Sequence, residues 1–207
     1  MKTRAAVIAV VMTVLAFTGR SQEKIKLDLG VMAGVNFAQL DGKTWNNGYK
    51  TNLLGGLFAG IHGGRAGIEI QPVFSQSAYV TGSDFHNIYS QYYNNAVDSV
   101  KQGTFRVSYL NIPVLFKLKV LNLLWLQVGP QYSGIVSTKD VDHLVKDSKQ
   151  LFKSGQLSGI GGLEVHLPFH LRVGARYVFG LTDLNGTSIS DTWKEKQIQV
   201  TVGYNFL

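Results

Sequence analysis

The chain has 207 residues, no cysteine and 23 glycines, and 16% of its residues are charged. This length allows one domain with a full core, and the lack of cysteine excludes disulfides, zinc–thiolate sites and a lipid anchor on cysteine. The net charge is +7, and it falls to +4 without the three basic residues Lys2, Arg4 and Arg20 at the N-terminus; this surplus is modest and scattered, so we expect no nucleic-acid partner.

The first 21 residues have the features of a secretory signal peptide. Lys2 and Arg4 precede an apolar core at 5–17, and small residues lead up to a cleavage site after Ser21. The apolar core is shorter than the roughly 20 residues that a spanning helix needs. We therefore expect cleavage there and one mature domain, 22–207.

Eight later segments alternate apolar and polar side chains with a period of two, which is typical of strands with two different faces. No apolar run after the signal is long enough for a spanning helix, and only a closed barrel satisfies strand backbone groups in lipid. The predicted strands are 27–40, 52–62, 65–80, 104–120, 123–136, 154–167, 170–181 and 195–207.

The last two segments show the alternation most clearly. In 195–207 an apolar residue stands at every second position from Ile198 to Phe206, with polar residues or glycine between them. In 170–181 the side chains of Arg172 and Arg176 fall on the face opposite the apolar one. A soluble sandwich would rarely place two arginines inside and so continuous an apolar face outside, so the pattern favours a membrane barrel.

The connections between the predicted strands alternate between long and short. The long ones are 41–50, 81–103, 137–153 and 182–194, and the short ones are 63–64, 121–122 and 167–169. This asymmetry is typical of outer-membrane barrels. We expect an all-β, eight-stranded antiparallel up-and-down transmembrane barrel in the outer membrane. Its partners would be membrane lipid and, through the C-terminal strand, the barrel-assembly machinery.

The short turns also predict which side chains face one another. A two-residue Gly63-Gly64 turn places His62 opposite Arg65 and Phe58 opposite Glu69. A three-residue turn at 167–169 places Glu164 opposite Arg172 and leaves Arg176 able to reach Glu69 across the lumen. Prolines at three strand positions remove ladder donors and predict bulges there, namely Pro72, Pro113 and Pro130.

Five charged side chains are predicted to point into the barrel. The lumen of an eight-stranded barrel is only wide enough to be filled by side chains, so we expect a structural ion-pair network and not a conducting path. The predicted network is Glu69, Lys117, Glu164, Arg172 and Arg176.

Aromatic residues near the predicted strand ends suggest girdles at the two membrane–water interfaces. Carbohydrate stacking is the alternative for those at the long-loop end. The interface aromatics are Trp45, Tyr49, Tyr79, Trp193, Tyr204 and Phe206.

Two polar clusters lie in the long loops. Asp140, Asp142 and His143 could hold a metal, and Ser83, Asp84 and His86 could suggest an enzyme acting at the outer rim. A solvated loop is the simpler explanation of both, so we expect no metal site, no cofactor and no catalytic residues. The longest loops, 81–103 and 137–153, are instead the expected surfaces for a partner.

Six blocks resemble the PorT-like outer-membrane β-barrel family of Bacteroidota. They are LGVMAGVNFAQL, EIQPVFSQ, SYLNIPVLFKLKV, LQVGPQYSG, GARYVFGLTDLN and VGYNFL, in that order along the chain. The resemblance implies an outer-membrane barrel whose strand prolines are family features. The family usually has a carboxylate where this chain has Asn111, which removes one lumen charge.

The namesake of that family is implicated in protein export. Taken together, these features predict a non-enzymatic barrel that presents outer loops for binding or supports an envelope or protein-secretion assembly. A membrane-embedded enzyme and a narrow channel are the alternatives.

Overall fold

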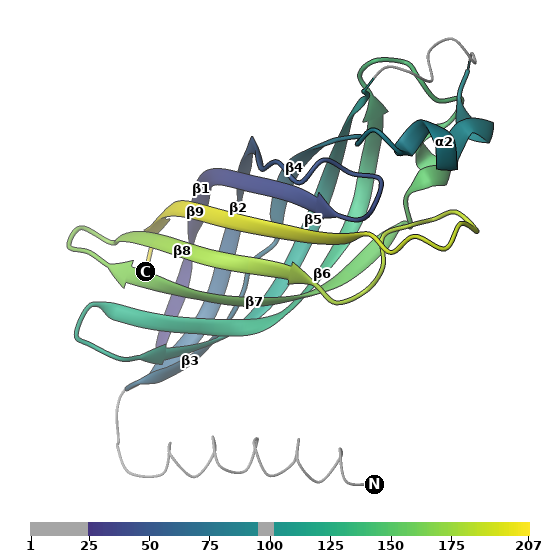
Figure 1. Ribbon diagram of the computed structural model, residues 1–207. Coiled ribbons are helices and arrows are strands. Elements are labelled where there is room, and N and C mark those ends of the chain that lie inside the picture. The colour runs from purple at the N-terminus through teal and green to yellow at the C-terminus, as the bar shows by residue number, and fades with distance from the viewer. Residues whose placement is uncertain (1–24, 95–101) are drawn as a thin grey trace, which may run out of the picture.

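The computed structural model describes residues 25–94 and 102–207, and its strands close into one antiparallel ring (Figure 1). The predicted signal peptide, 1–21, lies outside the described residues. The strands are β1 (Lys26–Asp41), β2 (Lys50–Gly63), β3 (Ala66–Ile70), β4 (Val73–Val80), β5 (Thr104–Lys119), β6 (Leu124–Asp140), β7 (Gly155–His166), β8 (Leu171–Gly180) and β9 (Lys194–Asn205). The predicted up-and-down barrel is confirmed.

The ring has nine strand segments but eight positions, because the third predicted strand is divided. Gln71 and Pro72 separate β3 from β4, and both pieces pair with β2 and β5 without a change of register. The ring closes at β1, which pairs with both β2 and β9.

The strand prolines do not mark bulges. The shift between β5 and β6 lies at Ser108 and Tyr109, whereas Pro113 and Pro130 sit in ladders of constant register. A proline loses its donor but keeps its carbonyl acceptor, and the amide of Gln71 donates to the Pro113 carbonyl at 3.1 Å. The predicted bulges are therefore wrong, although Pro72 does end a strand segment.

Both predicted turn registers are wrong by two residues. The β2–β3 turn is Gly64 and Arg65, with Gly64 at a φ of 58°, so His62 lies opposite Gly67 and Gly60 opposite Glu69. A shift of two keeps every side chain on its predicted face, because the alternation has a period of two. Phe58 is therefore still buried inside the barrel.

The turn between β7 and β8 shows the same error. Leu167 donates to the Leu171 carbonyl at 2.8 Å, and the turn residues Phe169 and His170 both have a φ of 63°. Glu164 consequently lies opposite Gly174, and Arg172 lies opposite His166. Glu164 and Arg172 therefore do not face each other across the ladder as predicted, although their side chains still form an ion pair, with Arg172 Nη1 3.8 Å from Glu164 Oε1.

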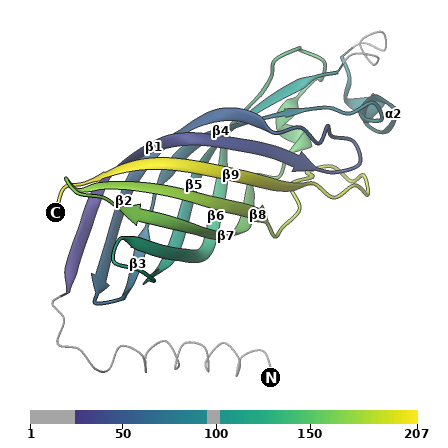
Figure 2. The same ribbon diagram turned by 60° about the vertical axis from the view of Figure 1, so that its left-hand side comes forward.

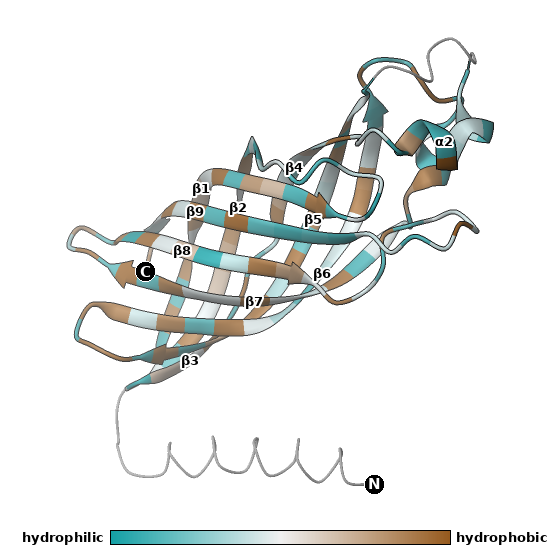
Figure 3. Cartoon of the chain, in the orientation of Figure 1, coloured by the Kyte–Doolittle hydropathy of each residue, from teal (hydrophilic) through white to brown (hydrophobic). Residues whose placement is uncertain are grey.

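Side chains on the two faces of the ring differ sharply in polarity, and bands of opposite hydropathy alternate along the strands (Figure 3). The outer wall exposes large apolar residues, including Leu53, Phe116, Val128, Val202 and Tyr132. The lumen buries Asn, Gln, Ser and charged side chains, including Asn36, Ser75, Gln127, Gln131 and Gln199. The barrel is thus apolar outside and polar inside.

The long connections gather at the end of the barrel opposite the C-terminus, where α2 lies (Figure 2). They contain α2 (Phe85–Tyr89) and two 3-10 helices, η1 (Ser90–Tyr92) and η3 (Ser148–Leu151). Isolated bridges join neighbouring loops, pairing Trp45 with Thr81, Tyr93 with Val145 and Phe152 with Asn185.

Among residues 25–94 and 102–207, no helix has both the length and the hydropathy to cross a bilayer.

Candidate functional site

The half of the lumen nearest the short turns contains a buried charge network. The Lys117 Nζ lies 2.9 Å from Glu69 Oε1 and 2.7 Å from Glu164 Oε1. The Nη1 of Arg172 lies 2.8 Å from Glu69 Oε2, and its guanidinium sits 4.4 Å from the centre of the Phe58 ring. Buried ions are tolerated only when paired and hydrogen-bonded, and these side chains meet that condition.

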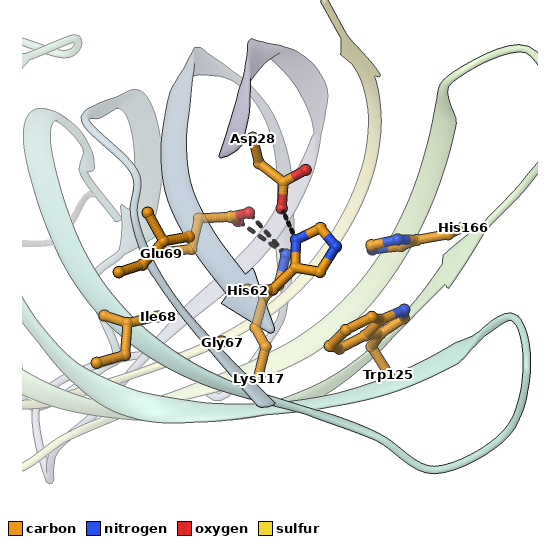
Figure 4. Close-up of a pocket in the computed structure, with 9 residues that line it drawn as sticks. Asp28, His62, Gly67, Ile68, Glu69, Lys117, Trp125 and His166 are labelled. Atoms are coloured by element: carbon orange, nitrogen blue, oxygen red, sulfur yellow. Dashed lines mark hydrogen bonds and ion pairs between the residues drawn. The ribbon is translucent and has the colours of Figure 1, made fainter. Parts of the chain in front are cut away.

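Three further ionisable residues, which were not among the predicted five, join the network. Asp28 lies 2.6 Å from Arg172 and 2.8 Å from His62 Nδ1, and His166 Nε2 lies 2.6 Å from Glu164. The ring of Trp125 contacts both histidine rings: its centroid lies 5.5 Å from that of His62, edge to face, and 5.1 Å from that of His166, stacked (Figure 4).

Alternation places all three residues on the lumen face. Asp28 falls on the polar face of the first strand, and His62 and His166 have the same parity as Phe58 and Glu164 in their strands. Their contacts with the network depend on strand register, which the alternation does not determine.

Arg176 occupies a different place from the predicted one. Its Nε donates to Gln199 at 2.6 Å and its Nη1 to Gln71 at 2.5 Å, while Gln71 in turn donates to Glu69 at 2.6 Å. The predicted Arg176–Glu69 ion pair is therefore wrong, because Arg172 occupies that carboxylate. With Asp28 included, three carboxylates face three Lys or Arg cations in this half of the lumen.

At the other end, the long loops share one buried aromatic cluster, which we call the loop cap. Trp45 is central: its ring centroid lies 5.0 Å from that of Trp193 and 5.3 Å from that of Phe85. Each long connection contributes to the loop cap, which comprises Trp45, Phe85, Tyr89, Tyr93, Leu144, Val145, Leu151, Phe152, Leu184 and Trp193.

The loop cap corrects half of the predicted interface aromatics. Trp45, Tyr79 and Trp193 are 4%, 2% and 0% exposed and lie inside, not on the lipid-facing wall. Tyr49, Tyr204 and Phe206 are 44%, 46% and 53% exposed, so they remain available at the surface. The burial of Trp45 and Trp193 follows from the packing of the loops on one another, which strand alternation does not encode. Tyr79 instead belongs to β4 and shares the inward face of Ser75 and Ser77, so the alternation of that strand does predict its burial.

Carboxylates in the long loops bind the backbone. Asp140 accepts hydrogen bonds from the amides of Asp142 and Val145, and Asp142 accepts one from Thr104. His143 has a φ of 54° and its carbonyl accepts from the Asn94 side chain. These contacts order the turn after β6. Within the described part of the chain, no group of three metal-ligating side chains occurs.

Two loop residues have shifted pKa values with clear causes. Burial and the charge of Asp191 raise the pKa of Tyr89 to about 12. Burial acts to raise the pKa of Asp183, but hydrogen bonds from the amides of Asn185 and Trp193, with nearby Lys153, lower it below its ordinary value. Asp183 therefore ties the last long loop together as a carboxylate.

A closed ring of strands with an apolar outer wall and a polar, charge-paired lumen defines the class of transmembrane β-barrels. The outer membrane protein beta-barrel domain family matches residues 20–186, and the chain belongs to that family. The protein is therefore located in the outer membrane. In such barrels the short turns face the periplasm and the long loops face outward.

Several solved outer-membrane barrels are similar to this chain at low identity. Neisserial surface protein A is 10% identical, with 89% of this chain and 100% of that chain covered and a TM-score of 0.49. Ail of Yersinia pestis, in complex with the heparin analogue sucrose octasulfate, is 10% identical, with coverage of 87% and 99% and a TM-score of 0.48. OprG of Pseudomonas aeruginosa is 13% identical, with coverage of 89% and 98% and a TM-score of 0.46. No curated protein matches the chain.

Proposed function

We propose that the chain is a non-enzymatic outer-membrane barrel whose long loops, held together by the loop cap, form a binding surface for a partner in the cell envelope. The observation that carries the proposal is the shared core of the four long loops. Loops ordered before binding lose little conformational freedom when a partner docks. A surface built this way suits recognition better than four independent flexible loops would.

The lumen supports the same proposal. Phe58, Tyr109 and Gln127 are buried inside the barrel, and the charges near the short turns are paired with one another. A filled interior of eight strands offers no route for a substrate. The exposed surface of the long loops is then the part of the protein that faces outward and is free to bind.

The carboxylates in and beside the long loops support a non-enzymatic role. Asp140 and Asp142 hold backbone amides, and Asp191 accepts hydrogen bonds from Thr44 at 2.8 Å and Trp193 at 3.0 Å. General acids and bases need a free, positioned group near a reacting atom. Here these groups have structural partners instead.

The resemblance to the PorT-like family directs the proposal toward an envelope or protein-secretion assembly. That resemblance rests on six blocks in the right order, among them SYLNIPVLFKLKV and GARYVFGLTDLN. In this reading the partner is another envelope protein, and the barrel anchors it or guides it at the cell surface.

Site-specific photo-crosslinking in intact cells tests the proposal. A photoreactive residue at Ile88 or Val141, which are 40% and 38% exposed on the long loops, should yield a discrete protein adduct. Val128, which is 53% exposed on the wall, is the matched control and should yield none. Adducts only at Phe169, in the β7–β8 turn, would move the binding surface to the periplasmic rim.

A further inference from the structure

The outer wall of the barrel changes from apolar to polar near the long loops. Along β5, the outward side chains from Leu118 to Leu110 are all apolar. The next two outward residues are Ser108 and Arg106. The strand rise of about 3.4 Å per residue, with a tilt of about 40°, makes the apolar stretch about 21 Å tall, which nearly fills the roughly 25 Å apolar band of such barrels. Ser108 and Arg106 therefore lie at the headgroup level of the outer leaflet.

The two neighbouring strands change at the same level. At the end of the apolar stretch, the cross-strand neighbours of Leu110 are Phe74 on β4 and Gly134 on β6. The next outward rung consists of Gln76, Ser108 and Ser137, which are half-buried or exposed. Each of these side chains can donate a hydrogen bond. The boundary between the apolar wall and the polar surface therefore runs level across β4, β5 and β6.

A bulge in β6 sets which side chains face outward above this boundary. The β5–β6 register shifts between Ser108 and Tyr109, because Val136 is an extra residue in β6. Below the bulge the outward residues of β6 have even numbers, such as Tyr132, whereas above it they have odd numbers, such as Lys139. Because a bulge re-aims the side chains that follow it, Lys139 is turned onto the outer wall.

Two cations face each other on the rung above the polar one. Arg106 and Lys139 are direct partners in the β5–β6 ladder, and both side chains are exposed on the outer wall. Residues opposite each other in an antiparallel pair have Cβ atoms about 5 Å apart, and like charges there repel. Within 25–94 and 102–207, neither side chain forms an ion pair with a carboxylate. An anion from outside the chain would remove this repulsion.

Other charged groups near this end of the wall already have partners. Beyond the end of the β5–β6 ladder, the carboxylate of Asp142 accepts a hydrogen bond from the Thr104 amide at 2.7 Å. On the other side of the ring, Lys196 of β9 lies 2.7 Å from Asp41 of β1. Lys196 thus has a counter-ion within the protein, whereas the two facing cations of β5 and β6 have none among the described residues.

We propose that Arg106 and Lys139 bind one phosphate group of a lipid headgroup in the outer leaflet. Arginine forms bidentate hydrogen bonds with phosphate oxygens, and lysine adds a point charge. The polar rung below supplies further donors, namely Gln76, Ser108 and Ser137. The apolar wall beneath that rung, where Leu110 and Phe74 are 44% and 52% exposed, holds the acyl chains. A soluble anion would use only the upper part of this surface, so the combination selects an amphiphile.

Native mass spectrometry of the barrel in detergent micelles counts the lipids that stay bound and tests the site. Lipid A, a glycolipid with two phosphate groups, should leave one molecule bound to the protein. Phosphatidylcholine should bind about tenfold more weakly or less, because its choline group offsets the charge of its phosphate. Inorganic phosphate in large excess should displace little of the lipid A, because it has no acyl chains to contact the apolar wall.

Variants link the binding to the two cations. Arg106→Gln combined with Lys139→Gln should weaken lipid A binding by about tenfold or more, since hydrogen bonds to charged groups are lost. Arg106→Lys keeps the charge but loses the bidentate geometry, so it should weaken binding less than Arg106→Gln. Lys196→Gln is the matched control, because Lys196 is a wall cation that already has Asp41 as its partner, and it should leave lipid A binding unchanged.

Equal retention of lipid A by the wild-type protein and the double variant would overturn the proposal. An equal loss in Lys196→Gln would also overturn it, because general attraction between charges would then explain the binding. Complete displacement of lipid A by inorganic phosphate would exclude a lipid as the ligand. If the double variant does not fold, the single variants Arg106→Gln and Lys139→Gln decide the matter, and each should retain less lipid A than Lys196→Gln.

Discussion

Lys117 links the charged residues of the lumen into one connected network. It contacts Glu69 and Glu164 together, while Arg172 contacts Glu69 and Asp28. Removing Lys117 would leave two carboxylates facing each other without their shared cation. Breaking a buried pair in this way costs far more than breaking an exposed one.

We therefore expect Lys117→Met to lower the free energy of unfolding by about 3 to 5 kcal/mol, less if water enters the lumen. Lys153→Met is the control, because Lys153 is half exposed and lies 3.4 Å from Asp183, and its loss should cost about 1 kcal/mol or less. Urea unfolding in detergent micelles measures both. Similar losses for the two variants would contradict the buried network.

A double-mutant cycle distinguishes the partners of Glu164. The Glu164 carboxylate lies 2.7 Å from Lys117 but 3.8 Å from Arg172. The coupling energy of the Glu164→Gln and Lys117→Met pair should therefore exceed that of Glu164→Gln with Arg172→Met. Additive effects in the first cycle, measured by the same urea unfolding, would show that the close pair is not formed.

At the scale of elements, the long loops behave as one unit. Three isolated bridges connect successive loops, and Trp45 packs against aromatic rings from the other three long connections. A change in one loop therefore disturbs the others. Deleting either of the two longest loops, 81–103 or 137–153, would therefore alter the packing of the whole loop cap and not only the surface of the deleted loop.

Trp45→Ala should open the loop cap, since truncating a buried tryptophan costs about 3 to 5 kcal/mol. Limited proteolysis of the folded barrel should then cut several long loops and not only 42–49. Tyr49→Ala, in the same loop but 44% exposed, should leave the digestion pattern unchanged. Cleavage confined to the mutated loop would mean that the loops are independent.

The last long loop should loosen in acid. The folded state holds the pKa of Asp183 below its ordinary value of 3.8, so its contribution to stability is present above about pH 4. That contribution disappears as the pH falls through the lowered pKa. Hydrogen exchange across 181–193, corrected for the intrinsic rate, should lose protection near pH 3 relative to pH 5.

Asp183→Asn provides the comparison for the acid effect. Its side-chain oxygen can still accept from the amides of Asn185 and Trp193, but it has no charge to lose. Exchange protection in this variant should be nearly independent of pH over the same interval. An equal loss of protection in both proteins would assign the acid effect to another group.

At the scale of the whole molecule, the barrel is closed at two levels. The charge network fills the half near the short turns, and the loop cap covers the opposite end. We expect no stable channels in planar-bilayer recordings of the purified protein, with a porin in the same bilayer as the positive control. Reproducible conductance steps would refute the filled lumen and revive the channel alternative.

The sequence alone determined which strand residues face the lumen and which face the lipid. Glu69, Lys117, Glu164, Arg172 and Arg176 all lie in the lumen, as their alternation predicted, because a strand turns successive side chains to opposite faces. The long and short connections likewise predicted the barrel and its two unlike ends. These properties depend on neighbours in the chain, so local pattern is enough to predict them.

Register and loop packing were decided only by the tertiary structure. A slip of two residues preserves every face, so the sequence could not distinguish Glu164 opposite Gly174 from Glu164 opposite Arg172. Trp45 and Trp193 carry no periodic signal, and their burial depends on residues that are distant in the chain. Ring closure brings those residues together, and only then do the aromatic side chains have one another to pack against.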